Sequence, residues 1–249
     1  MSFKNKVVLI TGASSGIGAS ASVEFTKNGA NVAIVARNME KLNKVAQLCA
    51  ENGAKPLVIK ADIGNDDECQ KMIASVIKTF GRLDVLVNNA GFMHFGSILD
   101  GNILEAYDQT MKINVRAHIN ITSLAAPHLV KTKGNIINIS SVAASSVTPI
   151  KGGMPYCISK AALNHFTRCA AKELAGEGVR VNTVSPGPVI TDFMDNAGLK
   201  DVQFENFGDA LPLKRVSQAV EIANIILYLA NLSIQRDIGE EKATLFYTM

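Results

Sequence analysis

The sequence lacks several features that mark common protein classes. Its four cysteines, Cys49, Cys69, Cys157 and Cys169, form no Cys-x-x-Cys pair and have no histidine ladder beside them. Neither a metal site nor a disulfide framework is therefore predicted. No apolar run approaches the roughly 20 residues of a membrane span, and the first residues lead straight into a strand without the apolar core of a signal peptide. We expect a cytoplasmic protein whose cysteines stay reduced and which does not enter a membrane.

Neither sign of charge dominates the chain. Lys and Arg number 25 against 22 Asp and Glu, a net charge of +3 without clustering, so no nucleic acid or anionic membrane partner is indicated. There is no internal repeat, low-complexity segment or linker. A hydrophobic content of 47% with 19% charged residues is typical of a well-covered interior. We expect one domain over residues 1–249.

Short β-branched runs alternate with amphipathic segments along the chain. This alternation predicts an α/β fold with a doubly wound parallel sheet of about seven strands, right-handed crossovers and helices on both faces. A long helix is expected over Ala106–Lys131, kinked or restarted near Pro127. The predicted strands are Val7–Ile10, Asn31–Ala36, Leu57–Lys60, a strand from Val85, Gly134–Ser140, Val179–Ser185 and Ala243–Tyr247.

A glycine-rich turn follows the first predicted strand. The run Thr11-Gly12-Ala-Ser-Ser-Gly16-Ile-Gly18 leads into a helix, and such a turn lets backbone N–H groups approach a phosphate at the helix N-terminus. The spacing differs from the commoner Gly-x-Gly-x-x-Gly fingerprint, and tight strand-to-helix turns also need glycine in proteins that bind no ligand. With the strand and helix correctly placed, we predict a dinucleotide site.

The end of the second strand bears on the choice of dinucleotide. An acidic residue there would hold a ribose 2′-hydroxyl, but the chain has Ala36-Arg37. A guanidinium can donate two parallel hydrogen bonds to a 2′-phosphate, so we predict NADP(H) ahead of NAD(H). The alternative is that Arg37 only begins a solvated helix. Asp62, after the third strand, is either an acceptor for the adenine amino group or a turn residue, and Ala90 and Gly91 would let a flat cofactor lie close.

Tyr156 and Lys160 are four residues apart in a predicted helix. Their side chains therefore share one face, about 6 Å apart along the axis. An adjacent ammonium favours the phenolate, so we expect Lys160 to lower the pKa of Tyr156. A tyrosine tuned in this way can exchange a proton with a carbonyl or alcohol oxygen. The same spacing is also common by accident on amphipathic helices.

Four motifs in the right order resemble the short-chain dehydrogenase/reductase family, near its ketoacyl-reductase-like branch, over about residues 5–232. They are the Thr11–Gly18 turn, Asn88-Asn89-Ala90-Gly91, Tyr156-x-x-x-Lys160, and Pro186-Gly187 followed by Thr191. The resemblance implies a Rossmann-type fold. It also implies cofactor contacts from Gly12, Ser14, Ser15, Gly16, Ile17, Gly18, Arg37, Asp62, Ile63, Asn88, Ala90, Gly91, Tyr156, Lys160, Pro186, Gly187, Val189 and Thr191.

The resemblance assigns roles to four residues. Tyr156 would exchange the proton, and Ser141 would hydrogen-bond the substrate oxygen. Lys160 would hold the nicotinamide ribose and lower the tyrosine pKa, while Asn114 would fix a water that links Lys160 to solvent. Hydride would pass directly between the nicotinamide and the substrate carbon.

Two features depart from the family pattern. Ser141 and Tyr156 are fifteen positions apart, slightly more than usual, so the loop Ala143–Pro155 is predicted to bulge at the substrate mouth, with Ser145 and Ser146 as weaker alternatives to Ser141. The C-terminal segment lacks the usual Asp-Gly-Gly. We expect a homodimer or homotetramer, the tetramer being the less secure expectation.

The substrate end of the site is predicted to be apolar. Residues 192–214 are expected to form either a lid with an apolar underside or a docked helix pair. Pocket walls are expected from Met93, His94, Phe95, Met154, Phe193, Met194 and Phe207.

Together these expectations describe an NADP(H)-dependent carbonyl reductase or alcohol dehydrogenase. It would interconvert a ketone and a secondary alcohol, with a steroid-like or 3-oxoacyl substrate rather than a free sugar. One alternative is a cofactor-binding sensor or scaffold without turnover. Another is a nucleotide-sugar epimerase, which the glycine spacing and the short chain disfavour.

Overall fold

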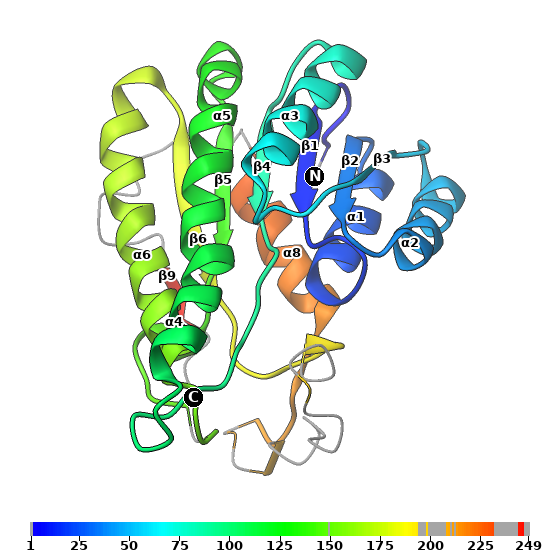
Figure 1. The fold of residues 1–249 in the computed structure, drawn as a ribbon. Coiled ribbons are helices and arrows are strands. Elements are labelled where there is room, and N and C mark those ends of the chain that lie inside the picture. Colours follow the sequence, from blue (N-terminus) through cyan, green and yellow to red (C-terminus); the bar gives the residue numbers. More distant parts are fainter. Residues whose placement is uncertain are drawn as a thin grey trace.

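One parallel sheet organises the molecule (Figure 1). The computed structural model describes residues 2–148, 150–193, 198, 208, 209, 211, 213–231 and, for the backbone alone, 244–246. Within these residues seven strands lie in the order β3-β2-β1-β4-β5-β6-β9, every neighbouring pair parallel. This confirms the predicted doubly wound sheet. The strands are β1 Val7–Thr11, β2 Asn31–Ala36, β3 Leu57–Lys60, β4 Val85–Asn88, β5 Asn135–Ile139, β6 Arg180–Ser185 and β9 Thr244–Phe246.

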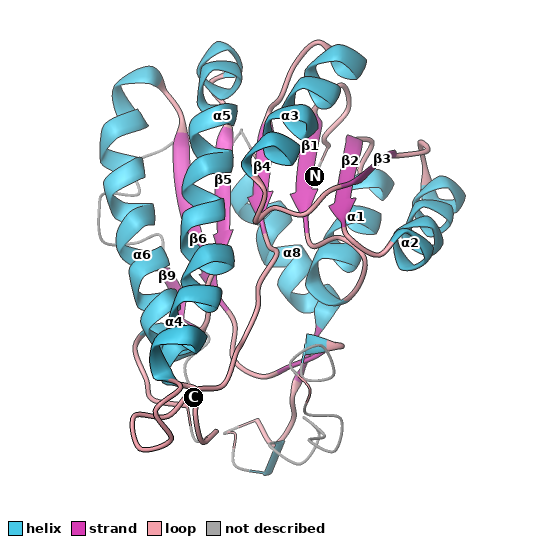
Figure 2. Cartoon of the chain, viewed as in Figure 1, coloured by secondary structure: helices cyan, strands magenta, loops and turns pink. Residues whose placement is uncertain are grey.

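Helices cover both faces of this sheet (Figure 2). Helices α1, α2 and α8 pack on one face, where Phe25 and Leu42 are fully buried. Helices α3, α5 and α6 pack on the other, around Met72 and Leu129. The helices are α1 Gly16–Lys27, α2 Met39–Asn52, α3 Asp66–Phe80, α4 Ile103–Met111, α5 Ala117–Thr132, α6 Met154–Leu174 and α8 Ala219–Ala230.

Strand β1 shows why the sheet must be covered twice. Val8 and Ile10 belong to one hydrophobic cluster, whereas Val7 and Leu9 belong to the other. Successive side chains of a strand point to opposite faces, so an unbroken apolar run is stable only with helices on both sides. The strand order reverses between β1 and β4, and open α/β sheets bind ligands outside the carboxyl ends of their strands at that point.

The helix predicted over 106–131 breaks in a different place. It is interrupted by a π-helical turn at Lys112–Arg116, and Pro127 lies inside α5 without ending it. The helix does not restart near Pro127: proline removes only one backbone hydrogen bond, and α5 continues through it. The actual break coincides with Asn114, whose side chain is held by residues far away in the sequence. Such π-turns are frequent at functional sites.

Local capping explains where other helices begin. Asn65 caps α3 by accepting hydrogen bonds from the backbone N–H groups of Asp67 and Glu68, as its side-chain type predicts. The helix after the glycine turn begins at Gly16, so the last two glycines of the motif belong to its first turn. None of the helices in the described residues combines the length and apolar character needed to cross a bilayer.

A second, two-stranded sheet pairs β7 (Val189–Ile190) with β8 (Ser217–Gln218). It fixes the chain just after the Pro186-Gly187 motif, beside the first sheet's carboxyl edge. Most of the lid predicted over 192–214 falls outside the described residues, and so do the predicted pocket residues Met194 and Phe207.

Candidate active site

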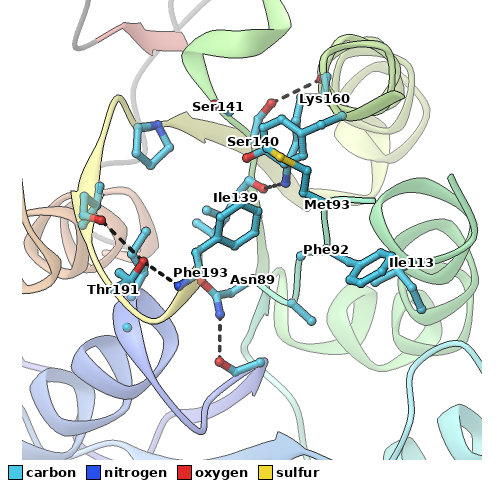
Figure 3. Close-up of a pocket in the computed structure, with 18 of the residues that line it drawn as sticks. Asn89, Phe92, Met93, Ile113, Ile139, Ser140, Ser141, Lys160, Thr191 and Phe193 are labelled. Atoms are coloured by element: carbon cyan, nitrogen blue, oxygen red, sulfur yellow. Dashed lines mark hydrogen bonds between the residues drawn. The ribbon is translucent and has the colours of Figure 1, made fainter. Parts of the chain in front are cut away.

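A cleft of about 900 Å³ opens at the carboxyl ends of the central strands. It collects segments that are far apart in the sequence, as Figure 3 shows for part of its wall. Of the residues predicted to bind the cofactor, the cleft is lined by Gly12, Ser14, Ser15, Gly16, Ile17, Arg37, Asp62, Ile63, Ala90, Gly91, Tyr156, Lys160, Pro186, Gly187, Val189 and Thr191.

The glycine turn is packed too tightly for side chains. A Cβ atom at Gly18 would lie 2.5 Å from both the Asn89 side-chain nitrogen and the Gly12 carbonyl oxygen. Gly12 and Gly16 have φ angles of +66° and +54°, which strain other residues. The result is a cradle of bare backbone at the N-terminus of α1. This cradle fits a dinucleotide phosphate, because N–H groups and the helix dipole both favour an anion there.

Asn89 and Thr11 hold this cradle against β4. The Asn89 side-chain nitrogen donates to the carbonyl oxygens of Thr11 at 2.9 Å and Gly12 at 3.1 Å. The Thr11 hydroxyl oxygen accepts from the backbone N–H groups of Asn89 and Ala90, each at 3.1 Å. The family resemblance predicts a cofactor contact from Asn88 rather than from Asn89. The role of Asn89 could have been suspected from its place at the end of a strand beside the glycine turn.

Asn88 lies beneath the cleft rather than in its wall. It is fully buried, and its side-chain nitrogen donates to Asn138 Oδ1 at 2.9 Å and to Thr122 Oγ1 at 3.2 Å. Because strand side chains alternate, Asn88 points toward the face of the sheet that α5 covers, while Asn89 faces the turn. The structure therefore places Asn88 as a link between β4, β5 and α5, away from the predicted cofactor contact.

At the opposite end of the cleft, β2 and β3 supply polar groups. Arg37 is exposed at the rim, and Asp62 accepts a hydrogen bond from Gly64 N at 2.9 Å through one carboxylate oxygen. Sequence reasoning missed Lys41, which also lines the cleft and forms an ion pair with Asp192 at 2.6 Å. Its position in the first turn of the helix after Arg37 could have indicated a second cationic side chain at this end of the cleft.

Ser141, Tyr156 and Lys160 meet at the carboxyl end of β5. Ser141 lies beside Tyr156, and its hydroxyl favours the phenolate form of that tyrosine. Lys160 is almost fully buried, its side-chain nitrogen donates to the Ile139 carbonyl oxygen at 2.8 Å, and the same nitrogen lies 5.5 Å from the centre of the Tyr156 ring (Figure 3 shows the Lys160 contact). Among the serines considered, Ser146 also lines the cleft, whereas Ser145 does not.

The expected lowering of the tyrosine pKa is wrong for this structure. Burial raises the pKa of Tyr156 to about 12, and the nearby Ser141 hydroxyl offsets this only in part. Burial also lowers the pKa of Lys160 to about 7. A lysine that is only partly protonated at neutral pH gives the phenolate less support than a permanent cation, so desolvation decides the direction.

Asn114 sits behind the cleft wall. From the π-turn its side chain pairs with the backbone of Phe92, accepting from N–H and donating to C=O, both at 2.8 Å. Its amide also donates to the Ser159 hydroxyl at 3.0 Å. Asn114 thus joins the Phe92 segment, which lines the cleft, to α6 next to Lys160. A water bridge from Asn114 stays a prediction.

The apolar wall differs in part from the one predicted. Met93 and Phe193 line the cleft, but His94, Phe95 and Met154 do not. Met154 is exposed because it lies in the first turn of α6 facing outward. Phe95 instead packs against Gly152, in the loop that precedes α6. The longer Ser141–Tyr156 loop does reach the cleft, through Ala143, Ser146, Val147, Thr148 and Ile150.

Comparison with known proteins agrees with this geometry. The family model described as short chain dehydrogenase matches residues 6–201. A 3-oxoacyl-[acyl-carrier-protein] reductase from Staphylococcus aureus is 36% identical over 228 residues, 91% of each chain. An uncharacterized oxidoreductase from Thermotoga maritima is 36% identical over 236 residues, 92% of each chain.

Solved structures show the same likeness. A short-chain type dehydrogenase/reductase from Mycobacterium marinum has a TM-score of 0.88 and 32% identity, covering 95% of this chain and 92% of its own. One from Caenorhabditis elegans, of unknown function and solved with cofactor, has a TM-score of 0.84 and 37% identity, covering 92% and 89%. The chain therefore belongs to the short-chain dehydrogenase/reductase family, is ketoacyl-reductase-like, and is an oxidoreductase.

Proposed function

We propose that this oxidoreductase uses NADP(H) to interconvert a ketone and a secondary alcohol. The observation that carries the proposal is the meeting of Ser141, Tyr156 and the buried Lys160 in the same cleft as the glycine cradle. When bound, the nicotinamide would supply or accept the hydride. The protein would supply orientation and the proton.

Tyr156 and Ser141 would both donate hydrogen bonds to the substrate oxygen. A carbonyl gaining hydride develops negative charge on its oxygen, and donors fixed in advance stabilise that charge. The raised pKa of Tyr156, about 12, keeps its hydroxyl protonated at neutral pH. A protonated tyrosine is the form needed to donate, so the geometry favours ketone reduction near neutrality and alcohol oxidation at alkaline pH.

The cofactor would span the cleft from Arg37 to Lys160. The Gly12–Gly18 cradle suits its phosphates, Asp62 its adenine, and the backbone near Val189 with the Thr191 hydroxyl its carboxamide. Arg37 and Lys41 put two cationic side chains at the rim of the adenosine end. This positive rim supports NADP(H) ahead of NAD(H).

An apolar carbonyl compound suits the other end of the cleft. Phe92, Met93, Val147, Ile150 and Phe193 line it, and methionine and aromatic walls adapt to flexible apolar chains. A 3-oxoacyl compound is the first candidate, supported by the name of the Staphylococcus aureus relative. A steroid-like ketone is the second.

Three broader expectations belong to the same proposal. The chain would act as one domain over residues 1–249, with the segment 192–214 as its substrate lid. It would assemble as a homodimer or homotetramer. It would work in the cytoplasm.

The test is NADPH-dependent turnover with Tyr156→Phe as the decisive variant. The assay would follow NADPH oxidation with 3-oxoacyl thioesters and steroid ketones. Tyr156→Phe should lower kcat by about 10²- to 10⁴-fold while NADPH affinity is kept. Tyr228→Phe is the matched control, because Tyr228 is 46% exposed on α8. Normal NADPH binding without turnover on any ketone would instead favour the sensor.

A further inference from the structure

Three consecutive residues after β7, here called the strap (Thr191, Asp192 and Phe193), contact three separate parts of the cleft. Thr191 packs on the glycine turn so closely that a Cβ atom at Gly16 would lie 2.8 Å from its methyl carbon. The Phe193 ring centre lies 5.6 Å from that of Tyr156. Figure 3 shows Thr191 and Phe193 side by side within the cleft wall.

The middle residue of the strap ties it to α2. The Asp192 carboxylate lies 2.6 Å from the Lys41 side-chain nitrogen, a contact between residues 151 positions apart. Lys41 is in the first turn of α2, where its backbone N–H donates to the capping Asn38 side chain at 3.0 Å. One ion pair therefore connects the adenosine end of the cleft to the segment that covers Tyr156.

This ion pair is of a kind that exchanges partners readily. Both side chains are 43% exposed, and ion pairs that water can reach are weak. Lys41 lines the same cleft as Arg37. A phosphate dianion placed there would offer Lys41 more charge and more acceptor oxygens than Asp192 does.

We propose that Lys41 is shared between two anions, and that the 2′-phosphate of NADP(H) takes it from Asp192 and so releases the strap from α2. The inference rests on the proposed use of NADP(H) and deepens it. NAD(H), without that phosphate, leaves the ion pair in place. Because coupling between two sites is reciprocal, the Asp192 contact must also lower the affinity for the 2′-phosphate.

Binding of the adenosine half alone tests this without turnover. The probes are adenosine 2′,5′-bisphosphate and 5′-AMP, titrated calorimetrically into the wild type, Lys41→Gln, Asp192→Asn and the double variant. Lys41→Gln should weaken the bisphosphate about tenfold and leave 5′-AMP unchanged. Asp192→Asn should tighten the bisphosphate about two- to fivefold, and this gain should vanish in the double variant.

Lys44→Gln is the matched control. Lys44 is also on α2 but pairs with Glu40, where the two side chains are 71% and 79% exposed, and it does not line the cleft. Its replacement should alter neither titration. Circular dichroism of every variant would confirm that the fold is kept.

Hydrogen exchange gives a second readout, on the strap itself. The amides of Asp192 and Phe193 should exchange faster with the bisphosphate bound than with 5′-AMP bound. Unchanged or slower exchange would overturn the proposal. So would an Asp192→Asn variant that binds the bisphosphate no better, or a Lys41→Gln variant that weakens both probes equally.

The outcomes also separate this inference from the proposed cofactor. If the wild type prefers the bisphosphate and only Arg37→Gln removes the preference, NADP(H) use stands and the role of Lys41 falls. If the wild type shows no preference for the bisphosphate, both the proposed use of NADP(H) and the proposed role of Lys41 are rejected.

Discussion

The side-chain nitrogen of Lys160 lies 5.5 Å from the centre of the Tyr156 ring. Burial nevertheless moves both pKa values toward the neutral forms, that of Lys160 to about 7 and that of Tyr156 to about 12. The protonation states of Lys160 and Tyr156 are therefore set mainly by desolvation.

The first prediction concerns Lys160 and alkaline stability. Its pKa is about 7 in the folded protein against 10.5 for an ordinary lysine, so between these two pH values the unfolded chain binds one more proton. Stability then rises with pH across this window, by at most about 1.4 kcal/mol per pH unit, and the contribution is lost as pH falls toward 7. Urea unfolding at pH 7, 8 and 9 should show this rise in the wild type and a smaller one in Lys160→Met. Equal pH slopes in the two proteins would contradict it.

The second prediction concerns the tight glycine turn. Gly18→Ala places a Cβ atom 2.5 Å from the Gly12 carbonyl oxygen, a backbone atom that cannot rotate away. We expect a loss of about 1–3 kcal/mol in the free energy of unfolding and weaker NADPH binding. Denaturant titration measures the free energy of unfolding, and NADPH fluorescence measures the binding.

Gly176→Ala is the control for the glycine prediction. A Cβ atom at Gly176 meets nothing within 4 Å, so its stability should change by less than about 0.5 kcal/mol. Similar losses in the two variants would show that close contact at Gly18 is not the cause.

The third prediction concerns His118 and acid stability. His118 is fully buried on α5, and burial together with the nearby Lys160 charge lowers its pKa from 6.5 to about 3. Its Nε2 lies 2.9 Å from the Ala90 carbonyl oxygen; because the ring is neutral at pH 7, this nitrogen carries the proton and donates. Between pH 6.5 and 3 this histidine is protonated in the unfolded chain but stays neutral in the folded protein. The free energy of unfolding therefore decreases as the pH falls through that range.

His118→Gln separates this effect from those of other groups. Glutamine can still donate to Ala90 but does not titrate. As the pH is lowered from 6.5 to 4, the Tm of thermal unfolding should therefore fall less steeply in the variant than in the wild type. Parallel curves of Tm against pH in the two proteins would mean that the pKa of His118 is not lowered in the folded state.

The fourth prediction concerns Asn114 as a positioning residue. Asn114→Ala removes the partners of the Phe92 N–H and C=O groups and one partner of Ser159. Unpaired groups of this kind cost about 1–3 kcal/mol each, so we expect a stability loss of about 2–4 kcal/mol. Because the same bonds join the cleft wall to α6, kcat should fall more than NADPH affinity does.

Asn120→Ala is the control for Asn114. Asn120 lies on α5, and its side-chain amide donates to the half-exposed Asp66 carboxylate at 3.2 Å. Its loss should cost less than about 1 kcal/mol and leave kcat unchanged. A small effect at Asn114 would show that the π-turn does not depend on its amide.

The strands and most helices could be read from the sequence because they depend on local patterns. The run Asn31–Ala36 is apolar and β-branched, and it forms β2 with the same bounds. Asn65, a residue type favoured at helix N-caps, likewise caps α3. The break at the π-turn was not readable, because it depends on Asn114 meeting Phe92 and Ser159, 22 and 45 residues away.

The sequence by itself determined the doubly wound sheet, the glycine turn and the meeting of Ser141, Tyr156 and Lys160, since periodicity and turn chemistry act over a few residues and the carboxyl ends of parallel strands share one edge. Only the tertiary structure decided how deeply Tyr156 and Lys160 are buried, and hence which way their pKa values move. It also decided that Asn89 rather than Asn88 fastens the cradle and that Lys41 meets Asp192. Burial and contacts between distant residues depend on how all the layers pack, which no local pattern in the sequence specifies.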